Sequence, residues 1–283
     1  MSARSRVATC SAVKVSYLIA VKNKANTIAS CLESILKQKP DEVVVIDGWS
    51  TDGTWELVKK CKVICERDTG AGLASARNIG LSRCTGDYIV VIDGDQWVER
   101  DFDMKLKVAL ESNPCDAVFC VDKWVGYSIW AKAQQRLWEI SSTFRPARVK
   151  RPRVFRRSIL SSVGCYSENF HSLEDTDLHQ KLRKKSAHFC HSKIILFSDA
   201  THISVLSQYM RGVWYGSSLR KYFISHRCDY EHITSIAPLG FFTDFFMAFA
   251  ILATTRRVKV ALASLVLRFS WSIGWLVGVL RSL

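Results

Sequence analysis

About the first 125 residues of the chain alternate between short apolar runs and helical patterns. Four runs are rich in β-branched residues without regular polar alternation, which is typical of buried strands: 13–21, 42–47, 63–66 and 87–93. Helical patterns follow three of these runs: 26–38, 50–61 and 73–84. Strands of this kind, each followed by a helix, predict an α/β fold with a mostly parallel central sheet covered on both faces.

Acidic residues at the ends of these strands suggest a binding site. Ligands of parallel sheets bind at the carboxyl ends of the strands, where Asp47 and Asp93 both fall. In "VVIDGDQW", 90–97, Asp93 and Asp95 flank Gly94, so a turn can aim both carboxylates at one point. Such oxygen ligands suit Mg²⁺ or Mn²⁺, which commonly bridge to phosphates. An isolated Asp-x-Asp pair is also common in solvated turns, so this metal-site hypothesis depends on further motifs.

The middle of the chain continues the mixture of helices and strands. Helical patterns dominate 101–142, with one strand predicted at 116–122. A helix is predicted at 174–185 and a strand at 192–198. Between these regions, 145–157 contains seven Arg or Lys residues. This basic run either binds an anionic acceptor or is a solvated face that attracts anionic lipid.

The C-terminal part has the composition of membrane-associated helices. Residues 206–227 interleave aromatic and basic side chains, which predicts an interfacial helix, with an ordinary surface helix as the alternative. The segments 236–255 and 260–280 are nearly all apolar, and each has the roughly 20 residues that cross a bilayer core. They predict a transmembrane hairpin, or else helices that are buried in a dimer or lie on the membrane. Because unpaired charges at that depth are costly, we expect Asp244 and Arg268 to pair.

The net charge of +14 indicates a polyanionic partner, such as nucleic acid, an anionic membrane or a phosphorylated ligand. Nucleic acid is disfavoured because the basic residues are spread along the chain and form no recognition motif. A nicotinamide-dependent dehydrogenase is disfavoured because the loop "AVKNKANT" lacks the G-x-G-x-x-G pattern. A phosphorylated ligand and a membrane surface remain.

Five sequence blocks follow one another in an order that is more specific than any single motif. They are "VSYLIAVKNKANTIASCLESILKQ", "VVVIDGWSTDGT", "GLASARNIGLSRCTGDYIVVIDGD", "VFRRSILSSVGCYSE" and "LEDTDLHQKL". Over residues 14–205 the chain thereby resembles the inverting family 2 glycosyltransferases of the GT-A fold. The resemblance implies transfer of a sugar from a nucleotide-sugar, with Mg²⁺ or Mn²⁺ as the cofactor.

The resemblance also implies roles for residues that would bind the nucleotide. Backbone groups of Ala20, Val21 and Asn23 would line it, and Asp47 would accept the imide N–H of its base. Arg77 would approach the base or the diphosphate. We expect Asp47 to share one cleft with the acids of the other blocks.

Further along, the resemblance implies a metal site and a catalytic base. Asp93 would face the ribose. Asp93 and Asp95, which flank Gly94, would also bind the metal that bridges the diphosphate. His202 is a further candidate metal ligand, although a lone histidine is usually structural.

The pair Glu174 and Asp175 matches the acidic motif of the family's active site. Asp175 would deprotonate an acceptor hydroxyl, and Glu174 would orient the acceptor or the start of the helix. The alternative is that both acids only decorate a helix N-terminus, where carboxylates are favoured.

Some residues depart from the family pattern. Lys22 stands where an aromatic residue would stack on the base, and Trp49 offers a replacement stacking surface. These changes leave UDP and GDP both open. In "SQYMRG" no Trp follows Arg211, which disfavours a processive polysaccharide synthase.

These inferences predict three regions: a GT-A domain at 1–205, an interfacial helix region at 206–232 and two transmembrane helices at 233–283. The acceptor is then expected to be a membrane lipid, such as a polyprenyl phosphate or a lipid-linked glycan. The expected location is the cell membrane, with several spans, a cytoplasmic catalytic domain and oligomers possible. The alternative is a catalytically inactive membrane scaffold that keeps only the fold.

Overall fold

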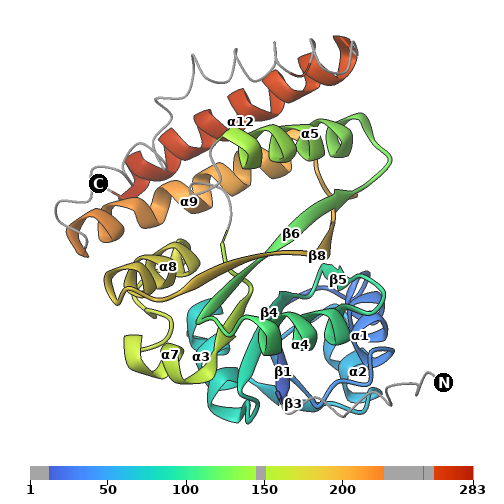
Figure 1. The fold of residues 1–283 in the computed structure, drawn as a ribbon. Helices are drawn as coiled ribbons and strands as arrows, with labels where there is room; N and C mark the ends of the chain where they lie inside the picture. Colours follow the sequence, from blue (N-terminus) through green and yellow to red (C-terminus); the bar gives the residue numbers. More distant parts are fainter. Residues whose placement is uncertain (1–12, 145–150, 226–250, 252–257, 283) are drawn as a thin grey trace, which may run out of the picture.

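The computed structural model describes residues 13–144, 151–225, 251 and 258–282. Its centre is an eight-stranded sheet with the strand order β3-β2-β1-β4-β7-β6-β8-β5 (Figure 1). The strands are β1 (Val15–Val21), β2 (Glu42–Asp47), β3 (Ile64–Arg67), β4 (Tyr88–Asp93), β5 (Gln96–Val98), β6 (Ala117–Val125), β7 (Val154–Arg156) and β8 (Phe189–Asp199). The predicted α/β class is confirmed.

The parallel half of the sheet, from β3 to β4, sets the position of the acidic residues. In the register of β1, Val21 lies beside Asp47 of β2, and Ala20 lies beside Asp93 of β4. The carboxyl ends of these three strands therefore meet at one edge of the sheet, as the sequence predicts.

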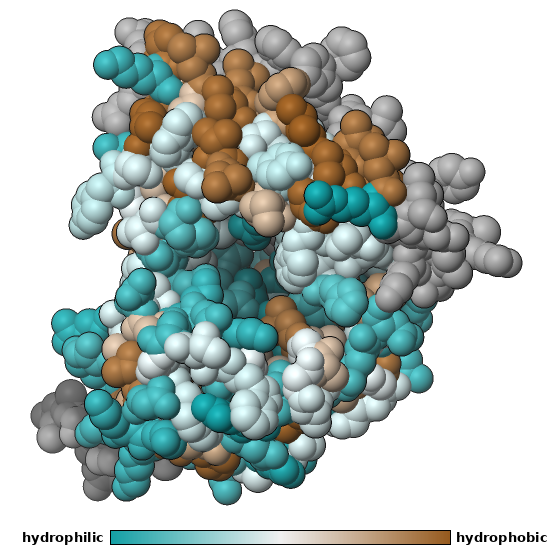
Figure 2. All heavy atoms as spheres, turned by 180° about the vertical axis from the view of Figure 1, so that it is seen from behind, coloured by the Kyte–Doolittle hydropathy of each residue, from teal (hydrophilic) through white to brown (hydrophobic). Residues whose placement is uncertain are grey.

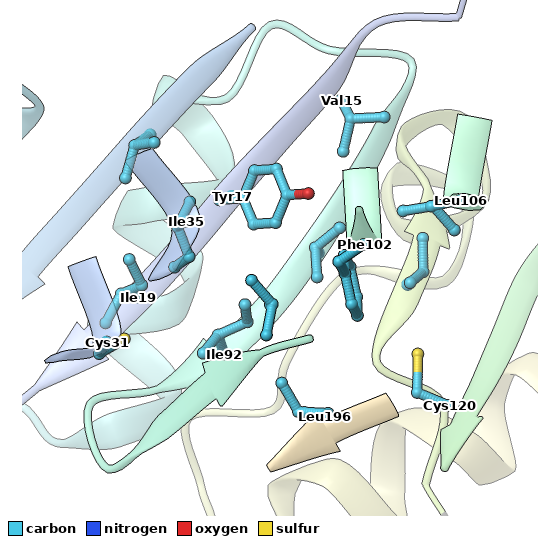
Figure 3. Packing of buried hydrophobic residues seen from close by; sticks show 14 of the residues in the cluster. Val15, Tyr17, Ile19, Cys31, Ile35, Ile92, Phe102, Leu106, Cys120 and Leu196 are labelled. Carbon is cyan, nitrogen blue, oxygen red and sulfur yellow. The ribbon is translucent and has the colours of Figure 1, made fainter. Parts of the chain in front are cut away.

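Helices cover both faces of this half. One cluster of buried side chains joins alternate residues of β1 to α1 (Ile28–Leu36), α2 (Thr54–Lys59) and α4 (Phe102–Ser112); Figure 3 shows Tyr17, Ile35 and Phe102 within it. The other cluster joins the opposite face to α3 (Leu73–Arg83), α7 (Arg157–Val163) and α8 (Glu174–Lys184). Because both faces are buried, the strands carry the continuous apolar runs seen in the sequence.

The second half of the sheet is mixed. Strand β7 is antiparallel to both β4 and β6, β6 is parallel to β8, and β5 is antiparallel to β8. Strands β5 and β7 and helix α7 were not predicted from the sequence. The two strands have only three residues each, and β7 lies within the basic run, so no apolar periodicity marks them.

Three helices form a layer across the carboxyl edge of the sheet: α5 (Ile129–Phe144), α9 (Val205–Ser225) and α12 (Val258–Ser282) (Figure 1). Helices α9 and α12 lie against one another and run in the same direction. Glycines permit this close approach, because a Cβ on Gly274 would lie 2.0 Å from the carbonyl oxygen of Tyr209. A Cβ on Gly216 would lie 2.2 Å from the carbonyl oxygen of Trp275.

The C-terminal predictions are only partly tested. The predicted apolar segment 260–280 forms α12, the one helix in the described part that is long and apolar enough to cross a membrane. Most of 236–255, including Asp244, lies outside the described residues, so the hairpin and the Asp244–Arg268 pair remain predictions. Helix α9 matches the predicted helix at 206–227, and its interfacial role also remains a prediction.

The glycine contacts predict that Gly274→Val separates α9 from α12. A valine side chain there would overlap the backbone of Tyr209, which cannot move aside as a flexible side chain can. We expect a loss of about 3 kcal/mol in the free energy of unfolding, measured by urea denaturation. In the control Leu276→Val, an exposed site of the same helix, we expect a change within about 0.5 kcal/mol. Equal losses in both variants would show that the close contact is not important for stability.

Candidate functional site

A cavity of about 960 Å³ lies between the carboxyl edge of the sheet and the helical layer. Figure 2 shows this hollow between a mostly hydrophobic upper part and a mostly hydrophilic lower part. Residues from β1, β4, α3 and the start of α8 line one side, and residues from α5, α9 and α12 line the other. The cavity therefore joins the segments from which the sequence predicts the donor site and the catalytic base.

A buried arginine connects two of the predicted acids. The Arg77 guanidinium donates to the Oδ1 of Asp93 at 2.9 Å and to the Oε1 of Glu174 at 2.7 Å. Arg153 donates to the other oxygen of Asp93 at 3.2 Å. Burial favours neutral Asp93, but Arg153 and Arg77 outweigh it and lower the pKa of Asp93 to about 2. Asp93 is therefore ionised throughout the physiological pH range.

Glu174 and Asp175 begin α8 and differ in their surroundings. Glu174 is buried, and burial together with the adjacent Asp175 raises the pKa of Glu174 to about 7, although Arg77 opposes this change. Asp175 lines the cavity and accepts a hydrogen bond of 3.3 Å from the hydroxyl of Thr176, whose oxygen accepts one of 3.0 Å from Arg151. Both acids line the cavity, but Glu174 is buried and bound to Arg77, whereas Asp175 is the more exposed of the two.

Asp95 also lines the cavity, and its Oδ2 lies 2.6 Å from the ammonium group of Lys24. The turn before it is tight, because a Cβ on Gly94 would lie 2.7 Å from the Cγ2 of Val21. Asp95 thus already faces one cation and offers the hard oxygen donors that suit Mg²⁺ or Mn²⁺. The residues present therefore fit a divalent metal at this position.

The other two predicted metal ligands are less well placed. Both oxygens of Asp93 are bound by arginine, so its carboxylate has less capacity for a metal than that of Asp95. His202 lines the cavity, and its Nδ1 lies 3.7 Å from Asp199. The described residues contain no cluster of three or more His, Cys, Asp or Glu side chains able to hold a metal. A site that holds Mg²⁺ mainly through one carboxylate and substrate phosphates is compatible with this arrangement.

The predicted nucleotide-binding loop is only partly exposed to the cavity. Ala20, Val21 and Lys22 line it. Asn23 does not: its backbone N–H donates to the hydroxyl of Ser50 at 2.9 Å, and its Oδ1 accepts from the N–H of Thr51 at 2.9 Å. The side chain of Asn23 therefore fixes the loop after β1 to the loop after β2.

Asp47 does not share the cavity, contrary to the expectation that it lines one cleft with the other acids. Its side chain is fully buried, and its Oδ2 accepts from the N–H of Ser50 at 3.0 Å and lies 3.7 Å from the Nε of Arg67. The Oδ1 has no hydrogen-bond partner among the described residues. Arg67 lies over the ring of Trp49, at 4.6 Å from its centroid, so a cation occupies one face of this predicted stacking surface, although the residue is still 53% exposed.

The cavity also contains residues that sequence reasoning did not single out. Lys24 lies beside Asp95, and Arg151 and Arg153 of the basic run line the wall. An ordered basic residue and a solvated one look alike in sequence, and the only signal was the cluster of charges. Six aromatic residues line the cavity, one from β6 and five from the helical layer: Trp124, Trp138, Trp214, Tyr215, Trp271 and Trp275.

Positive charge exceeds negative charge around the cavity. Five acids line it, Asp93, Asp95, Asp122, Glu174 and Asp175. Seven cationic residues line it, Lys22, Lys24, Arg77, Arg151, Arg153, Arg211 and Arg268. This balance suits a ligand with a negative diphosphate that also contacts carboxylates.

Comparison with known proteins agrees with this geometry. Residues 16–200 match the family model of glycosyl transferase family 2. The glycosyltransferase GlyA of Streptococcus pneumoniae is 34% identical over 96 residues, which are 31% of this chain and 14% of GlyA. The Escherichia coli glucosyltransferase WfaP is 40% identical over 91 residues, which are 30% of this chain and 36% of WfaP. The chain thus matches only a minor part of each of these relatives.

The fold is also shared with solved structures. The mannosyltransferase PcManGT from Pyrobaculum calidifontis, in complex with GDP-Man and Mn²⁺, superposes with a TM-score of 0.63 at 18% sequence identity. The superposition covers 93% of this chain and 87% of that one. Because the family model spans more than half of the chain, including the parallel sheet and the two acidic segments at the cavity, the chain belongs to glycosyl transferase family 2.

Proposed function

We propose that this protein transfers a sugar, with inversion, from a UDP- or GDP-linked donor to a membrane lipid acceptor. The acceptor is a polyprenyl phosphate or a lipid-linked glycan. The observation that carries the proposal is the cavity itself, where Asp95 and Asp175, from distant segments, face one space with an excess of cationic side chains.

The donor would lie against the β1–β4 side of the cavity. Lys22 and Lys24 can neutralise a diphosphate there, and the two arginines on Asp93 hold that carboxylate in a fixed orientation. A divalent metal bound by Asp95 would supply Lewis-acid stabilisation of the departing nucleoside diphosphate. The GDP-Man and Mn²⁺ bound to PcManGT, and the UDP-Glc in the name of WfaP, support this donor class.

Asp175 would act on the acceptor. It begins α8, faces the cavity and can take the proton of an acceptor hydroxyl as that oxygen attacks the sugar. The adjacent Glu174 is bound to Arg77 and would fix the position of the helix start. The donor and acceptor sides are thereby joined through one arginine.

A lipid acceptor is supported by the helical side of the cavity. Aromatic side chains of α5, α9 and α12 line it, and α12 is an apolar helix long enough for a membrane. The name of WfaP specifies a GlcNAc-diphosphoundecaprenol acceptor, which is a lipid-linked sugar. We infer a membrane-bound protein whose cavity faces the cytoplasm, where nucleotide-sugars are available.

The direct test incubates detergent-purified protein with labelled nucleotide-sugars, Mn²⁺ or Mg²⁺ and a membrane lipid extract. We expect label to move into a lipid fraction with one donor, and the mobility of the product identifies the acceptor class. An absence of transfer and of sugar-nucleotide hydrolysis with every donor would favour the inactive scaffold.

The position of Asp175 predicts a large loss of turnover for Asp175→Asn with a hydroxyl acceptor. Removal of the base is expected to lower kcat by about 10²- to 10⁴-fold. A phosphate acceptor has a second pKa of about 6 and is already ionised, so with it we expect substantial turnover. The control Glu168→Gln changes an exposed acid outside the cavity and should leave kcat unchanged. Full activity of Asp175→Asn with hydroxyl acceptors would exclude the assigned role.

The surroundings of Asp95 predict that Asp95→Asn weakens the coupling between metal and nucleotide. Calorimetric titration with UDP or GDP, with and without Mn²⁺, measures the gain in affinity that the metal gives. We expect this gain to fall by at least about tenfold, because even outer-shell changes at metal sites cost this much. The control Asp101→Asn alters an exposed acid at the start of α4. An undiminished gain in Asp95→Asn would assign the metal to other ligands.

A further inference from the structure

Helix α12 presents a regular line of large apolar side chains on its outer face. We define the α12 strip as Leu262, Val266, Phe269, Ile273, Leu276 and Leu280, whose exposed fractions run from 43% to 60%. Their spacing alternates between four and three residues, so they lie along one side of the helix. Such a continuous apolar surface is unusual for a protein face in water and marks an interaction site.

The opposite face of α12 is occupied by the catalytic half of the protein. Ala261, Ala263 and Leu267 belong to one buried cluster with residues of α5. Further along, the hydroxyl of Ser270 donates to the carbonyl oxygen of Val205 at 2.7 Å, and Gly274 contacts the backbone of α9. Arg268 lines the helical side of the cavity. From residue 261 onward the inner face therefore has no room for lipid.

This packing argues against α12 as a membrane span. A span would bring α5 into the hydrocarbon core beside it, since the two helices are in contact. Helix α5 carries exposed Lys132 and Arg136, and acidic and cationic side chains line the neighbouring cavity. Placing these charges in hydrocarbon is costly. Only the outer strip can enter the membrane without moving them.

We propose that α12 lies in the plane of the membrane surface, with the α12 strip immersed among the lipid acyl chains. An amphipathic helix in this orientation buries its apolar face roughly 5–10 Å deep and keeps its other face on the protein. Exposed Lys259 and Arg281 stand at the two ends of the strip, where they reach anionic headgroups. The separation of hydrophobic and hydrophilic surface in Figure 2 agrees with this orientation.

The charges at the ends favour a bilayer over a second copy of the chain. If two strips paired in parallel, Lys259 would meet Lys259 and Arg281 would meet Arg281. If they paired in antiparallel orientation, Lys259 would meet Arg281, which is again a pair of like charges. Anionic headgroups pair with both ends in either direction.

The orientation of α12 in the membrane has a consequence for how a lipid acceptor reaches the cavity. This consequence, unlike the orientation itself, rests on the proposed transferase function. The strip and the cavity-lining Arg268 and Trp271 lie on different faces of the same helix. The membrane is then about one helix diameter, roughly 10 Å, from the cavity. A lipid acceptor can therefore present its phosphate or sugar to the cavity while its chain stays in the bilayer.

Depth measurements on the full-length protein test the orientation without any nucleotide-sugar. A genetically encoded fluorescent amino acid replaces Leu262, Phe269 or Leu276, with Met104 on α4 as the exposed control position. The protein is reconstituted in vesicles of phosphatidylcholine and phosphatidylglycerol brominated at a shallow or a deep acyl position. We expect the three strip positions to be quenched equally, and more by shallow bromine, and position 104 not to be quenched.

Two results would overturn the proposal. A span would place position 269 about 10 Å deeper than 262 and 276, because seven residues of helix rise separate them. No quenching at any strip position would exclude the membrane as the partner. Light scattering without vesicles then tests whether a second copy covers the strip. The strip would be assigned to self-association by a dimer that dissociates in the double variant Leu262→Glu, Phe269→Glu and persists in the control double variant Met104→Glu, Val108→Glu. If the proposal holds, the first pair of changes abolishes quenching at position 276 and the second pair leaves it intact.

Discussion

The site depends on the two ion pairs that the guanidinium of Arg77 makes with buried or partly buried acids. Arg77 extends from α3 to Asp93 at the end of β4 and to Glu174 at the start of α8, and almost none of its side chain is exposed. An arginine this buried is stable only if it is paired, and breaking a buried pair typically costs about 3–5 kcal/mol. The same contact therefore fixes the sheet edge and α8 relative to one another.

Each acid that Arg77 binds has a neighbour in sequence that faces the cavity. Asp95 lies two residues after Asp93, and Asp175 directly follows Glu174. One acid of each pair is held by Arg77, and the other is left for the chemistry. The distance between the proposed metal site and the proposed base is thus set by one side chain, which is the kind of preorganisation that catalysis requires.

The sequence predicted the parallel half of the sheet well, and the rest less so. β1, β2 and β4 are buried on both faces, so their apolar runs mark them without ambiguity. β5 and β7 are three residues long, and their existence depends on pairing with distant strands, which local composition does not encode.

The site shows the same division between local and distant information. Asp93 and Asp95 could be placed because they follow a recognisable strand, and Asp175 because its motif resembles that of the family. The burial of Asp47 could not, because it depends on Arg67 of the neighbouring strand β3, which lies beside Asp47 in the sheet. Arg151 and Arg153 were hidden in a run of like charges, and the pairing of β7 with β4 and β6 brings that run to the cavity.

The C-terminal helix shows what hydropathy alone leaves open. Length and apolar content are the same for a helix that crosses a bilayer and for one that lies on it. What differs is the outer face: in α12 one face packs on the protein through Ala261, Leu267 and Trp275, and the other still carries large apolar residues such as Phe269 and Leu276. A helix on the surface of a water-soluble core would carry polar residues there, because exposure of apolar surface to water costs about 25 cal/mol per Å². Large apolar residues on the face that no protein covers instead suit a helix whose outer solvent is lipid.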